Sequence, residues 1–479
     1  GLGSALTNPF ITTDFSEALL EFVTPAYRES KQTIKFLSDI HQFTHDCIGN
    51  ELLWPASMPC LVSEDKNIPL ARYGSSNIGK MKTIYRRGLG YRYGRKMQVI
   101  AGIHFNYSLP KSFWAEYQNI EGSKLELDEF CSKSYMSLVR NFRRFGWIVL
   151  YLFGSSPAVS KSFFGNQNIK LQKFDSDTYF EPFSTSLRMS DLGYTSNTQA
   201  HLHISHNSLQ QYVKDLNNAI CTVEPNYRDI GLKEDGIYRQ LSLGQLQIEN
   251  EFYSSIRPKR VARSGERATS ALARGGIEYV EIRSIDIDPW EPVGISETTI
   301  NFLEVFVIYC LLEESPYFDQ VEWSEVIRNH SYTARKGRDP NFRLFRNGKK
   351  ISVADWGREI IEGLMLIAEQ MDYEIKENIF KKSIEDCALL LEAPDLTPSA
   401  RIIKDMIKDK LSFHDMTMEI ALRHKKYFES LSDISESRKR MYFDEVALSF
   451  QKQKVIEESD NLAFDDYLEK YFSEQGCCD

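Results

Sequence analysis

Three short segments in the first 300 residues alternate between polar and apolar side chains, a pattern that predicts strands with one polar and one apolar face. They are residues 102–109, 245–253 and 277–285. His104 and Asn106 share a face in the first segment, and Glu281 and Arg283 share one in the third. Ordinary solvation of one sheet face would explain any single strand of this kind. Because all three carry His, Gln, Glu or Arg, we expect a sheet whose charged, concave face can hold metal and phosphate.

Beyond residue 300, apolar residues recur with the period of amphipathic helices. The helical segments are residues 299–314, 353–371, 373–391, 399–410 and 435–458. Between the first two, a hairpin pairs 342–345 with 350–353 through Asn347 and Gly348, a pair typical of two-residue hairpin loops. No linker separates the two parts. We therefore expect an α+β fold with residues 1–479 in one domain, in which 1–300 form the sheet and the site and 301–479 are mostly helical.

Composition narrows the classes of partner. Lys and Arg number 58 against 67 Asp and Glu, a net charge of −9 that argues against a nucleic-acid binder. The longest apolar runs, 147–153 and 305–312, are far shorter than the ~20 residues that a membrane span needs. Eight cysteines are scattered without a CxxC pair, so no disulfide framework is indicated. We expect a cytoplasmic protein that binds neither nucleic acid nor membrane.

Several motifs suggest chemistry without completing it. Residues 74–80 fit the first seven positions of a phosphate-binding P-loop, but Met81 stands where Ser or Thr should bind magnesium. Residues 41–45 resemble a zinc-protease helix, but Gln42 replaces the catalytic glutamate, which favours an ordinary amphipathic helix with surface histidines. A basic stretch from Arg257 to Arg267 reads as a loop, and its place beside the strand with Glu281 suggests a lid that handles phosphate.

Asp14 and Glu21 are the acidic candidates near the N-terminus. Their spacing would put both on one face of a helix, while an extended reading puts Glu21 on a face with Leu19 and Val23. An acid among apolar residues is costly unless it meets a cation. A surface helix with spaced acids is the alternative, and the sequence leaves the choice open.

Taken together, these segments resemble the bacterial type of glutamate–cysteine ligase (γ-glutamylcysteine synthetase). The resemblance rests on long motifs in order, namely ITTDFSEALLEFVTP at 11–25, WPASMP at 54–59, KTIYR at 82–86, GIHFNYSLP at 102–110, YLFGSSP at 151–157, TSLRMSDLGY at 185–194, QIENEFY at 247–253, RPKR at 257–260 and GGIEYVEIRSIDIDP at 275–289. It implies a six-stranded antiparallel sheet, curved like a saddle, with helices packed outside. It also implies a reaction of ATP, L-glutamate and L-cysteine through a γ-glutamyl phosphate, the first step of glutathione biosynthesis.

The resemblance assigns roles residue by residue. The implied ligands of Mg²⁺, with Mn²⁺ as a substitute, are Asp14, Glu21, His104 and Glu281. Arg86 and Arg283 would clamp the phosphoryl group, and arginine forks match phosphate oxygens. The pocket for the second substrate would be lined by Tyr85, Arg188, Tyr194 and Tyr253, with Arg188 on its carboxylate. We expect a monomer.

Two alternatives to this reading stay open. A related carboxylate–amine ligase would join glutamate to another small amine, and a non-catalytic fragment would bind its ligands without turnover. The family's first strand, which carries a Glu-x-Glu pair, has no counterpart in a sequence that begins at Gly1. From that comparison we expect a metal site two carboxylates short, with low turnover and poor solubility.

Overall fold

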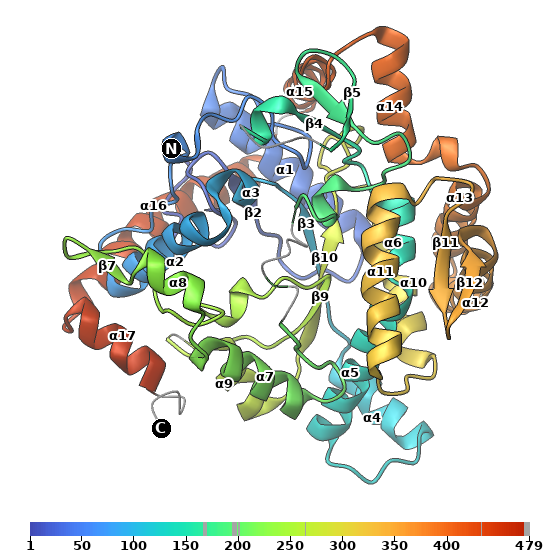
Figure 1. Cartoon of the computed structure of the whole chain (residues 1–479), viewed down its shortest axis with the longest axis horizontal. Helices are drawn as coiled ribbons and strands as arrows, with labels where there is room; N and C mark the ends of the chain where they lie inside the picture. The colour runs from blue at the N-terminus through green and yellow to red at the C-terminus, as the bar shows by residue number, and fades with distance from the viewer. Residues whose placement is uncertain (166–169, 194–198, 200–201, 264, 433, 474–479) are drawn as a thin grey trace.

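A three-stranded antiparallel sheet lies near the middle of the molecule, between helices on either side (Figure 1). Its order is β3 (Ile103–Tyr107), β10 (Tyr279–Ile285) and β9 (Ile256–Lys259). The computed structural model describes residues 1–165, 170–193, 199, 202–263, 265–432 and 434–473. In the register of the sheet, Glu281 lies opposite Asn106 on one side and Arg257 on the other. Glu281 of the central strand β10 is therefore flanked by a polar residue of each neighbouring strand.

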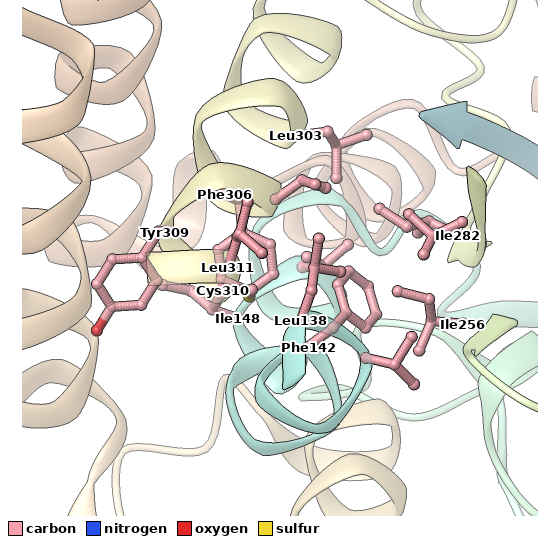
Figure 2. Close-up of a cluster of buried hydrophobic side chains, with 14 of the residues drawn as sticks. Leu138, Phe142, Ile148, Ile256, Ile282, Leu303, Phe306, Tyr309, Cys310 and Leu311 are labelled. Carbon is pink, nitrogen blue, oxygen red and sulfur yellow. The ribbon is translucent and has the colours of Figure 1, made fainter. Parts of the chain in front are cut away.

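The apolar face of this sheet packs on helices. Ile256 of β9 and Ile282 of β10 are fully buried and face side chains of α5 (Leu127–Phe145) and α10 (Glu297–Leu312), as Figure 2 shows. α6 (Trp147–Phe153) is buried along its whole length. α10 is apolar on nearly every side, which is typical of a helix enclosed by neighbours. Outside it pack α12 (Val353–Ile375) and α13 (Phe380–Glu392). This core fixes the sheet from behind.

The N-terminal segment forms a hairpin of β1 (Ile11–Thr13) and β2 (Leu20–Phe22), followed by α1 (Ser30–Ile48). Its first residues are tied to α16 (Glu436–Ser459) from the far end of the chain. The backbone N of Ser4 donates to the hydroxyl of Ser449 at 2.9 Å, and Thr7 Oγ1 donates to the carbonyl of Ser449 at 2.5 Å. The two ends of the sequence thus stabilise each other.

α2 (Asn77–Tyr93) runs beside the hairpin and leads into α3 (Arg95–Gln98). α17 (Phe464–Ser473) packs on it, with Leu468 buried beside Met81 and Ile84. Figure 1 shows α2 and α17 on the side of the sheet opposite α11 and α12. The remaining elements are α4 (Lys111–Ile120), β4 (Ala158–Ser160), β5 (Gln172–Lys173), β6 (Thr178–Phe180), α7 (Leu209–Cys221), α8 (Pro225–Ile230), β7 (Lys233–Glu234), β8 (Ile237–Tyr238), α9 (Ala268–Gly275), α11 (Gln320–Lys336), β11 (Arg343–Arg346), β12 (Lys349–Ser352), α14 (Pro398–Asp409), α15 (Phe413–Ser430) and the 3-10 turns Asp65–Asn67, Lys161–Phe163, Leu187–Met189, Glu249–Glu251 and Pro394–Leu396.

The predicted α+β class and the helical C-terminal part are confirmed. The hairpin at Asn347 and Gly348 is also confirmed, as β11 paired with β12. The predicted break at residue 372 is wrong, because α12 continues to Ile375. The Asp372 carboxylate explains the true break: it accepts bonds from the backbone N of Ile379, Phe380 and Lys381 and so caps α13.

The strand predicted at residues 245–253 is wrong. Residues 249–251 form a 3-10 turn, and two alternating acids face inward to buried cations. Glu249 accepts from Arg267 Nε at 2.8 Å, and Glu251 accepts from Arg92 Nη1 at 2.8 Å. The six strands that the resemblance implies do not form one hydrogen-bonded sheet within the described residues, whose sheets have two or three strands. Across the same residues, no helix is both long and apolar enough to cross a membrane.

Candidate active site

The polar face of the central sheet gathers one carboxylate, one imidazole and several cations. Glu281 lies on β10 with Arg283, whose Nη1 is 3.2 Å from Glu281 Oε2. Lys259 Nζ, from β9, is 3.5 Å from the same oxygen. His104 Nδ1, from β3, is 3.7 Å from Glu281 Oε1 and accepts a bond from Arg283 Nη1 at 3.3 Å. The pairing of three strands therefore brings these side chains together.

The charges of this group are set by its neighbours. Burial by itself would raise the pKa of Glu281, but Arg283, Lys259 and Arg257 hold that pKa well below its ordinary value. Glu281 is therefore a carboxylate at neutral pH. Burial and the charge of Arg283 lower the pKa of His104 well below its ordinary value. A neutral imidazole keeps a lone pair for a metal ion or a hydrogen-bond donor.

Asp14 and Glu21 belong to the β1–β2 hairpin, so the extended reading of this segment is confirmed. Glu21 pairs with Thr12 in the register, and Asp14 directly follows β1. Both residues are exposed at the surface. The surrounding protein nevertheless removes part of the solvent around their carboxylates, and this desolvation raises the pKa of Asp14 and raises that of Glu21 to about 7. Arg86 and Arg283 oppose both shifts, whereas Glu281 adds to that of Glu21. The hairpin acids are thus electrostatic neighbours of the sheet group.

Arg86, on α2, is positioned by contacts with the β1–β2 hairpin and with Tyr73. Its Nε donates to the backbone carbonyl of Asp14, and its guanidinium lies over the ring of Tyr73, 4.5 Å from the centroid. The hydroxyl of Tyr73 in turn donates to the carbonyl of Thr13 at 2.6 Å. Tyr73 therefore links α2 to the hairpin and holds the arginine beside Asp14.

Three of the four predicted pocket residues can be placed. Arg188 is buried, donates from Nη2 to the carbonyl of Arg283 at 2.7 Å and pairs through Nη1 with Asp286 Oδ1 at 3.3 Å. Tyr253 accepts a bond from Gln98 Nε2 at 2.8 Å. Burial raises the pKa of Tyr85, and the charges of Arg86 and Arg283 reach its ring. Tyr194 lies outside the described residues.

Of the four predicted metal ligands, His104 and Glu281 lie 3.7 Å apart, and Glu21 interacts electrostatically with Asp14 and Glu281, but the four do not form a preformed cage. Among the residues that the structure describes, no three His, Cys, Asp or Glu side chains are grouped closely enough to share an ion. The donors are nevertheless of the kind that magnesium takes, since three are carboxylates, although Glu281 Oε2 is ion-paired with Arg283 and Lys259.

Sequence reasoning missed the role of two cations. Arg257 and Lys259 were expected in a loop or lid, but both lie in β9 and face Glu281 from the neighbouring strand. The signal was present, because Arg257 and Lys259 alternate with Ile256 and Pro258. The proline and the dense charge made this short strand look like a loop.

The incomplete motifs hold no ligand of their own. At the start of α2, the backbone N of Ser75 donates to Glu457 at 2.7 Å and that of Asn77 donates to Asp460. Two of the backbone donors that a P-loop would offer to phosphate are therefore taken by the chain's own carboxylates. His41 and His45 were expected at the surface, but both rings stack on Phe428 of α15, which corrects that part of the prediction.

Comparisons with known proteins agree on one family. The family model described as "Glutamate-cysteine ligase" matches residues 1–333. The glutamate–cysteine ligase of Alcanivorax borkumensis is 44% identical over 98% of this chain and 90% of that protein, and that of Hahella chejuensis is 43% identical with the same coverage. The structure of glutamate–cysteine ligase from Francisella tularensis in complex with AMP superposes with a TM-score of 0.92 at 34% identity, covering 100% of this chain and 93% of the other. A bifunctional glutathione synthetase from Pasteurella multocida shares the fold, with a TM-score of 0.70 at 22% identity, over 97% of this chain and 54% of that one.

Proposed function

The chain belongs to the glutamate–cysteine ligase family, and from that premise we propose that it joins the γ-carboxylate of L-glutamate to the amine of L-cysteine at the expense of ATP. This reaction is the first step of glutathione biosynthesis. The observation that carries the proposal is the polar sheet face of Glu281, Arg283 and His104 with the hairpin acids and Arg86 beside it. The similarity to a ligase that binds AMP supports the use of ATP.

The reaction proceeds in two displacements. A γ-carboxylate oxygen of glutamate attacks the terminal phosphorus of ATP, ADP leaves, and γ-glutamyl phosphate forms. The cysteine amine then attacks the acyl carbon, the amide bond forms, inorganic phosphate leaves, and the amine loses a proton. Arg86 and Arg283 are the residues we assign to the transferred phosphoryl group, because bidentate guanidinium contacts stabilise its charge.

Asp14, Glu21, His104 and Glu281 are the residues that would hold magnesium. When bound, the ion neutralises the phosphate and carboxylate charges that must approach each other. Magnesium is usually held by one or two carboxylates together with substrate phosphates rather than by an all-protein cage. That preference fits donors that lie near one another without converging on one point. Burial and the negative charge of Asp14 raise the pKa of Glu21 to about 7, and a bound cation would favour its ionised form.

Tyr85, Arg188, Tyr194 and Tyr253 are the residues we assign to the pocket for cysteine. The ion pair with Asp286 fixes the guanidinium of Arg188 next to the carbonyl of Arg283, and therefore close to the phosphoryl-binding arginine. We further propose that residues 1–479 act as one catalytic domain and one cytoplasmic monomer, in which 301–479 support the site formed by 1–300.

ADP release tests this function directly. We expect ADP to form when the chain is given ATP, magnesium, glutamate and cysteine, and to fall by at least about 10-fold with alanine in place of cysteine. Release with 2-aminobutyrate would report how far the thiol matters. Preference for another amine would favour a related carboxylate–amine ligase, and no release with any amine would favour a non-catalytic binder. A Glu281→Gln variant serves as the inactive control.

A further inference from the structure

A cavity of about 280 Å³ lies on a different side of α2 from the candidate active site. The turn Asp65–Asn67, the segment after it, α2 and α3 line this cavity, which is open to solvent on one side. Four of its lining side chains are cations, namely Lys66, Arg72, Arg87 and Arg95, and Thr83 adds a hydroxyl. Its volume is just below the usual range for small-molecule sites, which favours a compact ligand.

The guanidinium groups are positioned by backbone carbonyls. Arg95 Nη1 donates to the carbonyl of Ile68 at 2.7 Å, and Arg87 Nη1 donates to that of Tyr238 at 2.6 Å. Neutral carbonyls orient a guanidinium but do not cancel its charge. Both side chains are therefore preorganised cations.

Within the described residues, no carboxylate forms an ion pair with Arg72, Arg87 or Arg95, whereas Lys66 Nζ pairs with Glu64 Oε2 at 3.0 Å. The nearest acids are engaged with the backbone. Asp65 accepts from the backbone N of Arg95 at 2.7 Å, and Glu17 accepts from that of Arg72 at 2.5 Å. Three arginines without a side-chain ion pair thus line one cavity, and the charges of Asp65 and Glu17 offset part of theirs. Like charges that line one cavity repel one another, and a bound anion would lower that cost.

We propose that this cavity binds a compact phosphate-bearing anion of about the size and charge of pyrophosphate. Arginine forks match phosphate oxygens, and several cations favour a ligand with more than one negative charge. The site is separate from the catalytic residues, because consecutive helical residues point about 100° apart. Arg86 accordingly contacts Asp14 and Tyr73, whereas Arg87 contacts Tyr238.

Calorimetric titration of the full chain with sodium pyrophosphate tests the proposal, in EDTA and at constant ionic strength. We expect the double variant Arg72→Gln/Arg87→Gln to raise the Kd for pyrophosphate by at least about 30-fold, since each lost charge-assisted contact costs roughly tenfold. The matched control Arg28→Gln/Arg228→Gln removes two exposed arginines elsewhere and should leave the Kd within about twofold of the wild type. A parallel titration with orthophosphate should give a higher Kd than pyrophosphate, which would show that the site recognises the larger charge of the diphosphate.

Three outcomes would overturn the proposal. They are unchanged binding in Arg72→Gln/Arg87→Gln, equal weakening in the control pair, or loss of all binding in Arg283→Gln with the cavity intact, which would place the anion in the catalytic site. Circular dichroism checks the fold of each variant. If the double variant does not fold, the exposed single variant Arg72→Gln decides by the same comparison, and Arg72→Lys should recover part of the affinity.

Discussion

At the scale of single residues, the candidate site depends on how Glu281 keeps its charge. The side chain is only 11% exposed, and an isolated carboxylate so buried would be protonated. Arg283, Lys259 and Arg257 prevent this, and together they outnumber the acid. The surplus of positive charge suits a face that must receive anionic substrates.

Replacing Glu281 by Gln keeps its size and removes its charge. We expect ADP release to fall at least about 100-fold, because the surrounding cations lose their counter-charge and a metal ion would lose a ligand. The matched control is Glu278→Gln, which changes an exposed acid just before the same strand. Turnover of Glu281→Gln close to that of Glu278→Gln would make Glu281 a structural residue.

Gly102 leaves room for Arg188. A Cβ at position 102 would overlap the guanidinium of Arg188, so Gly102→Ala must displace it. We expect kcat/KM for cysteine to drop about 10- to 100-fold, since a small misplacement of a binding group is costly. The KM values for glutamate and ATP are the internal controls and should change much less. An unchanged kcat/KM for cysteine would remove Arg188 from the cysteine pocket.

At the scale of secondary-structure elements, sequence patterns predicted an element correctly where its apolar side chains are buried and its polar side chains are exposed. β3 was predictable because its apolar residues face the core and His104 and Asn106 face outward. Alternation failed at residues 245–253, because Glu249 and Glu251 turn inward to Arg267 and Arg92 rather than to solvent. A buried ion pair reads in the sequence like an exposed charge, so local pattern could not separate the two cases.

The start of α2 is bonded to two acids at the end of α16: Glu457 lies in its last turn, and Asp460 directly follows it. Because Glu457 and Asp460 accept from the backbone N of Ser75 and Asn77, we expect Glu457→Gln/Asp460→Asn to lower the free energy of unfolding by about 1 kcal/mol. Urea denaturation measures the loss, and hydrogen exchange should quicken in residues 75–80. Glu458→Gln, an exposed neighbour paired with Lys454, should change neither. Equal exchange in both variants would mean that the helix start needs no acid.

At the scale of the whole molecule, one half-buried acid should govern part of the pH dependence of stability. Burial raises the pKa of Glu304, on α10, from 4.5 to about 7. The folded state binds the proton of this acid more tightly than the unfolded state does. The contribution of the protonated acid to the free energy of unfolding is therefore fully present below pH 4.5. It is lost as the pH rises to about 7.

Glu304→Gln should therefore stabilise the protein above pH 7 by about 2 kcal/mol and flatten the curve of unfolding free energy between pH 4.5 and 7. Denaturant titrations across this pH range provide the measurement. Glu297→Gln, on the same helix, removes the same charge and is the matched control. A steeper slope in Glu304→Gln would contradict this account.

The candidate site as a whole could not be assembled from local pattern. Spacing alone left Asp14 and Glu21 open between a helix and a strand, and nothing local joins them to β10, some 260 residues later in the sequence. The family resemblance alone indicated which residues form the site. The register of β3, β10 and β9 was needed to show that Arg257 and Lys259 lie beside Glu281. Long-range pairing is what a single sequence does not show.

The contacts of Ser4 and Thr7 with Ser449 carry a consequence for protein synthesis. The partners are 445 and 442 residues apart, so at ~5–20 residues per second the ribosome needs roughly 20–90 s to supply the second after the first. Until α16 emerges, the hairpin with Asp14 and Glu21 lacks its support. A nascent chain stalled before residue 436 should therefore leave this hairpin open to protease, whereas the released chain should protect it.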